Sequence, residues 1–312
     1  TINVKKQHAT HSILMFRKAA TYERLNDTQR QIEALKLANR IEFNLRKPNY
    51  LSPEARWDKS REVWERMNRI SSGSPKLKPD IGGPIVFIVG LPRCGSTAVA
   101  DYIYRHFKSR NCEEQGSINF LIDQLAADLS SAANGKMIER VKAYYDRLPV
   151  GTDRSILSAD DLIIDKSLFN FLHLGHICKL FADIKIIWMS RNHPEHTFAM
   201  YKQFLLGSAC SFCYDLDEIE KALNLQSRIK EFWRTSSVEF IEIKLEEFKE
   251  TPHMIGDLMD DWGSVERRAN TLDNDHSRIS MTASKAQIRQ KQTRSYDEAI
   301  SIEDLLASIR EK

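Results

Sequence analysis

The first part of the chain, residues 1–72, carries apolar side chains at the spacing of amphipathic helices. In residues 13–25 the apolar positions recur every three or four residues, and a polar Asn-Asp-Thr segment then interrupts them. Thr28, the last residue of that segment, is predicted to cap a second helix. A third helix with two tryptophans is expected over residues 53–70. The pattern therefore predicts an N-terminal helical extension over residues 1–72.

The first two of these helices follow the residue order of a tetratricopeptide helix pair. The positions that carry this likeness are Ala19, Tyr22, Leu25, Asp27, Leu35 and Ala38. Gln31 stands where such a repeat has a small residue. Because one repeat cannot bury its own faces, we expect this TPR-like pair to pack against the next domain.

Residues 73–84, rich in Gly, Pro and Ser, are predicted to be a linker. Beyond them, short apolar runs alternate with helical stretches. The predicted strands are 85–89, 162–164, 184–189 and 238–243, and the predicted helices are 169–181, 194–206 and 217–233. This alternation is typical of a parallel sheet covered by helices on both faces. We therefore expect an α/β domain with a P-loop-type parallel sheet over residues 85–312, with ligands at the carboxyl ends of the strands.

Composition and charge narrow the class of protein. The 312 residues are 42% hydrophobic and 29% charged, which is typical of a folded globular chain. The net charge of +3 excludes the broad positive field of a dedicated nucleic-acid-binding protein, so an anion must be held by a local cluster. No apolar run approaches the ~20 residues of a membrane helix. Five cysteines give no disulfide framework, so we expect a cytoplasmic protein. Homo-oligomerisation is left open.

A glycine-bearing loop, Gly90-Leu-Pro-Arg-Cys-Gly-Ser-Thr97, directly follows the first predicted strand and precedes a helix. This order aims backbone N–H groups and a helix N-terminus at an anion. The two glycines have the spacing of a Walker A loop, but Ser96 stands at the position of the Walker lysine. Arg93 supplies instead a planar cation suited to one terminal phosphate or sulfate. The loop is therefore predicted to hold a single phosphate–sulfate end and not a Mg²⁺-triphosphate.

This loop resembles the 5′-phosphosulfate loop of sulfotransferases that use 3′-phosphoadenosine 5′-phosphosulfate (PAPS). Residues 164–175, 185–191 and 280–290 are similar to further segments of that family, in the same order. More narrowly, the chain resembles bacterial tetratricopeptide-repeat sulfotransferases related to the tyrosylprotein sulfotransferases. The resemblance covers most of the chain. It implies transfer of a sulfuryl group from PAPS, without a metal, to a hydroxyl on a peptide tyrosine, a saccharide or a small metabolite.

The resemblance also implies roles for individual residues. Arg93 would contact the 5′-phosphosulfate, and Lys166 would stabilise the bridging or transferred oxygens. Arg191 would bind the 3′-phosphate. Ser284 would donate to the transferring sulfonate, and Arg289 would contact the nucleotide. The backbone N–H groups expected beside Arg93 are those of Cys94, Gly95, Ser96 and Thr97.

The chain departs from the family at its general base. The family's glutamate follows a glycine, and the matching pair here is Gly116-Ser117. Glu113 and Glu114 lie just upstream, and Glu114 is our provisional base, because a base must reach the acceptor proton. The chain also differs from the family at three other positions. Ala199 stands where the family has a serine that binds the 3′-phosphate, Leu245 where it has a tyrosine, and Lys291 where it has a proline.

Two other functions stay open at this point. One is a P-loop kinase or NTPase in which Asp165 binds Mg²⁺ in the manner of a Walker B aspartate, although the Walker lysine is missing. The other is a non-catalytic nucleotide-binding protein with the same fold.

Other reactive side chains give weaker signals. Cys94, at a helix N-terminus beside Arg93, is expected to have a lowered thiol pKa. Cys210 and Cys213 form a lone pair without a second pair at zinc-like spacing. His173 and His176 are expected to pack and not to catalyse.

Overall fold

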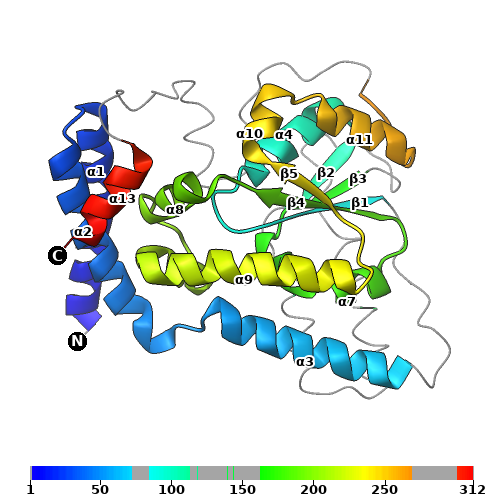
Figure 1. Cartoon of the computed structure of the whole chain (residues 1–312), viewed down its shortest axis with the longest axis horizontal. Helices are drawn as coiled ribbons and strands as arrows, with labels where there is room; N and C mark the ends of the chain where they lie inside the picture. The colour runs from blue at the N-terminus through cyan, green and yellow to red at the C-terminus, as the bar shows by residue number, and fades with distance from the viewer. Residues whose placement is uncertain are drawn as a thin grey trace. The chain divides into compact units, whose positions relative to one another are not determined.

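The computed structural model describes residues 2–71, 84–112, 162–268 and 301–311, together with the single positions 118, 139 and 143. It confirms the α/β class, with a parallel sheet flanked by helices and an N-terminal helical region (Figure 1). Among the helices within these ranges, none combines the length and apolar character that a membrane span requires.

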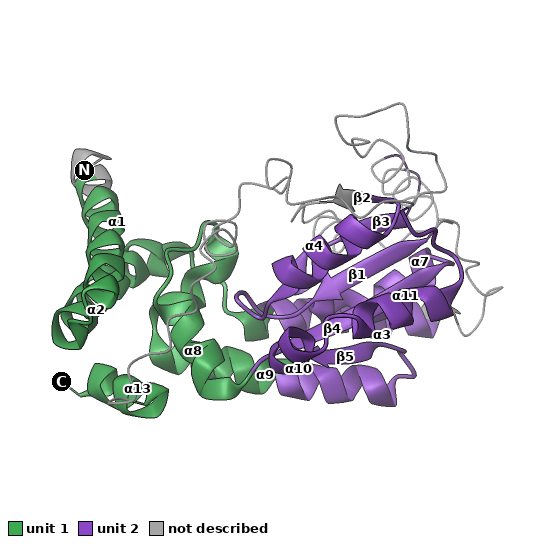
Figure 2. Ribbon diagram, turned by 90° about the horizontal axis from the view of Figure 1, so that it is seen from above, with its two compact units in different colours: residues 1–55, 192–226, 290–312 green, residues 56–191, 227–289 purple. Residues whose placement is uncertain are grey.

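The chain divides into two compact units (Figure 2). Unit 1 comprises Thr1–Ala55, Asn192–Gln226 and Gln290–Lys312, and unit 2 comprises Arg56–Arg191 and Ser227–Arg289. Each unit is assembled from segments that lie far apart in the sequence. Helix α3 (Pro53–Ser71) belongs almost wholly to unit 2, because its partners lie there.

Unit 2 contains a five-stranded sheet in the order β2-β3-β1-β4-β5, and every neighbouring pair is parallel. The strands are β1 (Ile85–Val89), β2 (Ser109–Cys112), β3 (Leu162–Asp165), β4 (Ile184–Ser190) and β5 (Ile241–Lys244). All five residues of β1 are buried, as expected for a central strand covered on both faces. Phe87 pairs with Asp165, the last residue of β3, and Val89 pairs with Trp188 of β4, so the carboxyl ends of these three strands are staggered, with β3 ending first and β4 last.

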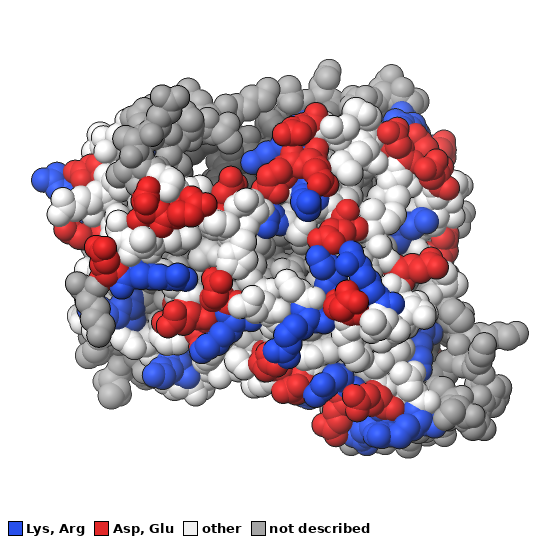
Figure 3. Space-filling view, in the orientation of Figure 1, with Lys and Arg blue, Asp and Glu red and all other residues white. Residues whose placement is uncertain are grey.

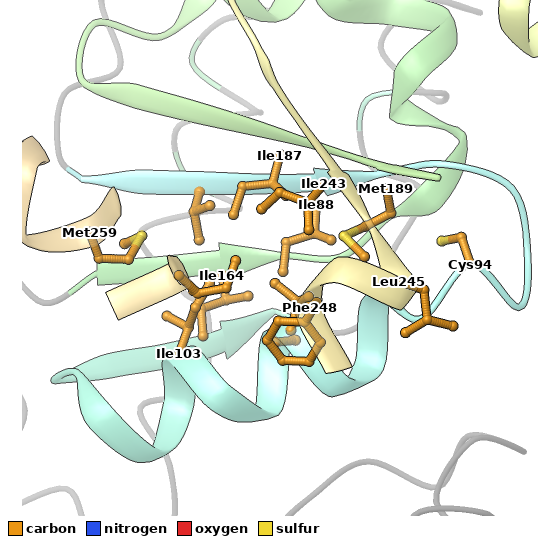
Figure 4. Packing of buried hydrophobic residues seen from close by; sticks show 14 of the residues in the cluster. Ile88, Cys94, Ile103, Ile164, Ile187, Met189, Ile243, Leu245, Phe248 and Met259 are labelled. Atoms are coloured by element: carbon orange, nitrogen blue, oxygen red, sulfur yellow. The ribbon is translucent and has the colours of Figure 1, made fainter. Parts of the chain in front are cut away.

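One face of the sheet is covered by α4 (Ser96–His106), α10 (Leu245–Glu250) and α11 (Met254–Trp262) (Figure 1). Between them and the strands lies a cluster of buried apolar residues (Figure 4). Its members include Ile88, Ile103, Ile164, Ile187, Met189, Ile243, Phe248 and Met259. Each large side chain buried in this way stabilises the fold by about 1.5–3 kcal/mol, so the cluster supports the carboxyl ends of the central strands.

The opposite face is covered by η2 (Leu168–His173), α7 (Leu174–Leu180) and the C-terminal part of α9 (Leu216–Thr235). Helix α3 packs on these elements through aromatic rings. Trp57 and Trp64 lie 5.5 and 5.6 Å from the ring of Trp233. Gly175 permits this approach, because a Cβ there would lie 2.6 Å from Trp233 and 2.8 Å from Trp64.

Two buried histidines lie beneath α3. The Ser60 hydroxyl donates to the Leu172 carbonyl at 2.6 Å and lies 2.7 Å from Nδ1 of His173. Because a carbonyl only accepts, the hydrogen between Ser60 and His173 belongs to the His173 ring. The His176 ring is fully buried and lies 5.6 Å from Trp64. The expectation that both histidines pack is confirmed.

Unit 1 is built on the helix pair α1 (Ile2–Arg24) and α2 (Thr28–Arg46), followed by η1 (Lys47–Asn49). The pair packs with α8 (His193–Tyr201), η3 (Ser208–Tyr214) and α13 (Ile302–Arg310). Phe16 lies 5.9 Å from Phe204 and 6.0 Å from Tyr214. Asn39 donates to the Tyr201 carbonyl at 3.0 Å. The helix pair therefore buries its inner face against later parts of the chain.

Several predicted boundaries differ from the structure. Asp27, and not Thr28, caps α2 by accepting from the N–H of Arg30 at 3.1 Å. The segment 169–181 starts as a 3₁₀ helix before it becomes α7, and α8 ends at Tyr201, five residues before the predicted end at 206. Strand β2 was not predicted, because Ser-Arg-Asn-Cys has no apolar run and forms an edge of the sheet.

The two histidines should make the fold sensitive to acid. Burial, with a smaller contribution from the charge of Lys179, lowers the pKa of His176 to about 3, and burial lowers the pKa of His173 well below its ordinary value. Both rings therefore stay neutral in the folded state, whereas the unfolded chain takes up protons below about pH 6.5. The free energy of unfolding should fall by up to about 1.4 kcal/mol per pH unit for each ring as the pH drops below that value.

Urea unfolding at about pH 7.5 and about pH 5 measures this loss. In His176→Leu the loss should be smaller than in the wild type, because one titrating ring is gone. His253→Leu, which removes an exposed histidine, is the control and should keep the wild-type loss. An equal loss in His176→Leu and the wild type would contradict the expectation.

Candidate functional site

Three positively charged side chains follow three neighbouring strands of the sheet. Arg93 lies in the loop after β1, Lys166 directly follows β3, and Arg191 directly follows β4. Since β3, β1 and β4 are adjacent and parallel, their carboxyl ends meet at one edge. The structure therefore brings together the three cations that the sequence singled out.

The loop between β1 and α4 has an unusual backbone. Gly90, Arg93 and Gly95 all have positive φ angles, of 155°, 71° and 96°. A Cβ at Gly90 would lie 2.8 Å from the Met189 carbonyl, so no larger residue fits there. Arg93 is held in the left-handed region at a cost of about 1–2 kcal/mol, which only the surrounding structure can offset.

Helix α4 presents an anion-binding end to this loop. Gly95 is its N-cap and provides no side chain to accept from the first turn. The first N–H groups of a helix have no intrahelical acceptor, and together they carry about half a positive charge. The N–H of Cys94 donates inside the loop to the Leu91 carbonyl at 3.3 Å, whereas Ser96 and Thr97 belong to the first turn of α4. The helix end suits a phosphate or sulfate group.

Arg93 and Arg191 lie next to each other. Nη1 of Arg191 donates to the Arg93 carbonyl at 3.3 Å. Burial, and after it the positive charge of Arg191, lowers the pKa of Arg93 to about 10. Arg93 therefore stays protonated at neutral pH, and two like charges face the same edge of the sheet. An anion between them would remove their repulsion.

Lys166 lies close to the same loop. Its side chain is only 3% exposed, and its charge acts on the Cys94 thiol. The Leu168 carbonyl accepts from the N–H of Gly90 at 3.0 Å, so the segment after Lys166 is tied to the first residue of the loop. A lysine is almost never fully buried in a protein unless it is paired.

The expectation that the pKa of the Cys94 thiol is lowered is wrong. Cys94 is fully buried and belongs to the apolar cluster (Figure 4). Burial raises its pKa, although hydrogen bonds from Ser96 and the charge of Lys166 act in the opposite direction. The helix end is therefore too weak to ionise a thiol that no water reaches.

Leu245 has a contact that sequence reasoning missed. It directly follows β5, is buried, and packs on Gly95, where a Cβ would collide with its side chain. Figure 4 shows Leu245 and Cys94 near the end of the sheet that carries the loop. The only signal in the sequence was that Leu245 lies two residues after the predicted strand 238–243. Its side chain holds the N-cap of α4 in place.

Other predicted positions lie elsewhere or outside the described residues. Ala199 lies on α8 in unit 1, and Cys210 and Cys213 lie in η3, where burial raises the pKa of Cys213. The positions outside the described ranges are Glu113, Glu114, Ser117, Ser284, Arg289 and Lys291. The roles expected for them stay predictions.

The surface charge agrees with a local site. Charges of both signs are interspersed over the face shown in Figure 3. The net charge of the whole chain is only +3. Three cations at one sheet edge are therefore a local feature and not part of a broad basic surface.

Comparison with known proteins relates the chain to a family and to a curated relative. A family model described as "Sulfotransferase family" matches residues 84–255, which is more than half of the chain and includes Arg93, Lys166 and Arg191. A protein from Aquifex aeolicus (strain VF5), described as uncharacterized, is 24% identical over 183 residues. That alignment covers 55% of this chain and 23% of the relative, so the chain spans less than a quarter of the relative's length.

The contact between Gly95 and Leu245 predicts coupled effects on stability. Gly95→Ala should lower the free energy of unfolding by about 2–4 kcal/mol, through backbone strain and overpacking. In the double variant with Leu245→Ala, the loss should be about 1 kcal/mol less than the sum of the single losses, because the shorter side chain makes room.

Urea unfolding of the four proteins measures the coupling. Gly263→Ala is the matched control, since Gly263 also has a positive φ, of 71°, but a Cβ there meets nothing within 4 Å. The control should therefore show the cost of strain alone. If the losses in the free energy of unfolding from Gly95→Ala and Leu245→Ala were strictly additive in the double variant, the described contact between the two residues would be contradicted.

Proposed function

The chain belongs to the sulfotransferase family, and we propose that it transfers a sulfuryl group from PAPS to a hydroxyl group of an acceptor. The observation that carries this proposal is the meeting of Arg93, Lys166 and Arg191 beside a glycine loop without a Walker lysine. Ser96 stands at the lysine position, is 5% exposed, and its backbone and side chain form hydrogen bonds with the Cys94 sulfur. The chain therefore has no positively charged side chain at the Walker lysine position that could bind the phosphates of a triphosphate.

The charges at the sheet edge fit PAPS. PAPS supplies the sulfuryl group and carries phosphate at both the 5′ and the 3′ position. In our proposal Arg93 and the N–H groups of Ser96 and Thr97 hold the 5′-phosphosulfate. Arg191, next to Arg93 at the end of β4, binds the 3′-phosphate. Bidentate guanidinium contacts suit both phosphates.

Lys166 has the catalytic role in this proposal. As a sulfuryl group moves from a phosphate to an acceptor oxygen, negative charge spreads over the bridging oxygen and the sulfonate. A buried ammonium at the end of β3 stabilises this charge more strongly than an exposed one, because less water screens it. Ser284 would donate to the sulfonate, and Arg289 would contact the nucleotide.

The acceptor is proposed only by class. A peptide tyrosine, a saccharide or a small metabolite would present the hydroxyl, and Glu114 is the proposed base. The TPR-like character of the helix pair and the relation to tyrosylprotein sulfotransferases are parts of the same proposal. We also propose a domain organisation with a helical extension over residues 1–72, a linker over 73–84 and a P-loop domain over 85–312. The proposed location is cytoplasmic.

The donor is tested by calorimetry with 3′-phosphoadenosine 5′-phosphate in the presence of EDTA. We expect saturable binding to the wild type, weaker by about 10²-fold or more in Arg93→Ala, because a charge-assisted bidentate contact is lost. Arg40→Ala, which removes an exposed arginine of α2, is the control and should bind as the wild type does. Transfer of ³⁵S-sulfate from labelled PAPS to a panel of hydroxyl acceptors then tests the reaction.

Two results would contradict the proposal. Nucleotide binding that requires Mg²⁺ and favours ATP would support the kinase or NTPase alternative. Tight nucleotide binding without transfer to any acceptor would support a non-catalytic binding protein.

Lys166→Ala should separate turnover from donor binding. We expect kcat to fall by about 10²–10³-fold, because the ammonium acts on charge that develops in the transition state. The affinity for 3′-phosphoadenosine 5′-phosphate, which lacks the sulfuryl group, should change by less than about fivefold. Steady-state kinetics and calorimetry on the same preparations measure both. If kcat and the affinity for 3′-phosphoadenosine 5′-phosphate fell by the same factor, Lys166 would bind the nucleotide itself and would not act on the transition state.

A further inference from the structure

Asp165 ends β3 with a buried carboxylate. It is 1% exposed, and Oδ1 accepts from the N–H of Ser167 at 2.8 Å and from Nδ2 of Asn170 at 3.4 Å. A buried carboxylate is costly unless hydrogen bonds or charges compensate it. Both of these donors come from the segment directly after Lys166. Through one backbone N–H and one side-chain amide, the carboxylate therefore holds this segment to the end of β3.

The bond from Asp165 to Ser167 encloses one residue, which is Lys166. A side-chain oxygen that accepts from the N–H two positions later closes an Asx turn around the residue between them. This ring restricts the backbone angles of Lys166 and with them the direction in which its side chain leaves the chain.

The residues that follow the turn are also held by hydrogen bonds. Ser167 precedes η2, and its carbonyl accepts from the N–H of Asn170 at 2.8 Å. The next residue, Leu168, accepts from the N–H of Gly90 at 3.0 Å. One end of the turn is thus fixed in the sheet and the other to the first residue of the glycine loop. Lys166 lies between two fixed points.

We propose that Asp165 is a positioning residue whose carboxylate holds the turn that aims Lys166 at the sulfuryl group. This inference rests on the proposed function. Asp165 acts through Lys166 in this account and does not itself touch the donor. The alternative, a Mg²⁺ ligand of a nucleoside triphosphatase, needs the carboxylate charge, whereas the turn needs only an oxygen acceptor.

Substitutions of Asp165 can separate the need for an oxygen acceptor from the need for a negative charge. Asparagine keeps an oxygen that accepts from Ser167, and alanine does not. Asp165→Ala should lower kcat by about 10²-fold, since misplacing a catalytic group has effects of this size. Asp165→Asn should restore most of that turnover, to within about fivefold of the wild type. Neither variant should change the affinity for 3′-phosphoadenosine 5′-phosphate by more than about threefold.

A double-mutant cycle shows whether Asp165 acts through Lys166. The variant Asp165→Ala/Lys166→Ala should be no slower than Lys166→Ala, because no side chain remains to be positioned. If the fall in kcat of the double variant equalled the product of the two single falls, the inference would be overturned. An Asp165→Asn variant as slow as Asp165→Ala would overturn it too, as would activity that depends on Mg²⁺ and is lost in both.

Competitive acetylation with acetic anhydride, followed by peptide mass spectrometry, gives a readout that needs no activity. Lys166 should react about tenfold faster in Asp165→Ala than in the wild type, because a released lysine reaches solvent more often. Asp165→Asn should keep the slow reaction. Equal rates in all three proteins would overturn the inference, even if the wild type transferred no sulfuryl group. Absence of transfer with the expected labelling pattern would instead count against the proposed function alone.

If Asp165→Ala does not fold, Ser167→Pro provides the second variant. Ser167 has a φ of −74°, which proline adopts, and proline removes the N–H that Asp165 binds, although it also removes the hydroxyl and disfavours helical backbone angles at Lys166. Turnover should fall and the acetylation of Lys166 should rise, as in Asp165→Ala. Wild-type values for both would overturn the inference.

Discussion

The account depends on like charges held together at one edge of a parallel sheet. Arg93 and Arg191 are close enough for the charge of Arg191 to lower the pKa of Arg93, and Lys166 is almost fully buried beside the same loop. Such an arrangement is unfavourable by itself, because repulsion and desolvation both oppose it. In our proposal, an anion with more than one charge lies among the three side chains and offsets both costs. The fold must therefore supply the free energy that keeps these groups in place.

The rigid surroundings of the loop provide that support. The buried side chains beneath α4 fix the strand ends, and Leu245 covers Gly95 so that the helix N-cap cannot shift. The carboxylate of Asp165 organises the turn that carries Lys166, and Leu168 ties the turn to Gly90. These contacts hold the positive end of α4 and the backbone that carries Lys166. Such preorganisation is the main source of catalysis when charge spreads in the transition state.

The sequence predicted the α/β class and the cation-bearing ends of β1, β3 and β4, because apolar strands followed by glycine or charged residues are local patterns. It did not predict what depends on distant contacts. Strand β2 is polar and has its place only through pairing with β3. Helix α3 groups with the sheet because its tryptophans meet Trp233, far along the chain. The raised pKa of Cys94 follows from burial that no local pattern reveals.

A crystal structure of the chain with 3′-phosphoadenosine 5′-phosphate, grown without divalent cations, tests the central claim most directly. The account predicts the 5′-phosphate within hydrogen-bond distance of Arg93 and of the N–H groups of Ser96 and Thr97, and the 3′-phosphate on Arg191. The ammonium of Lys166 should point to the open side of the 5′-phosphate. A nucleotide bound away from this sheet edge, or bound there with the three cations turned away from it, would contradict the account.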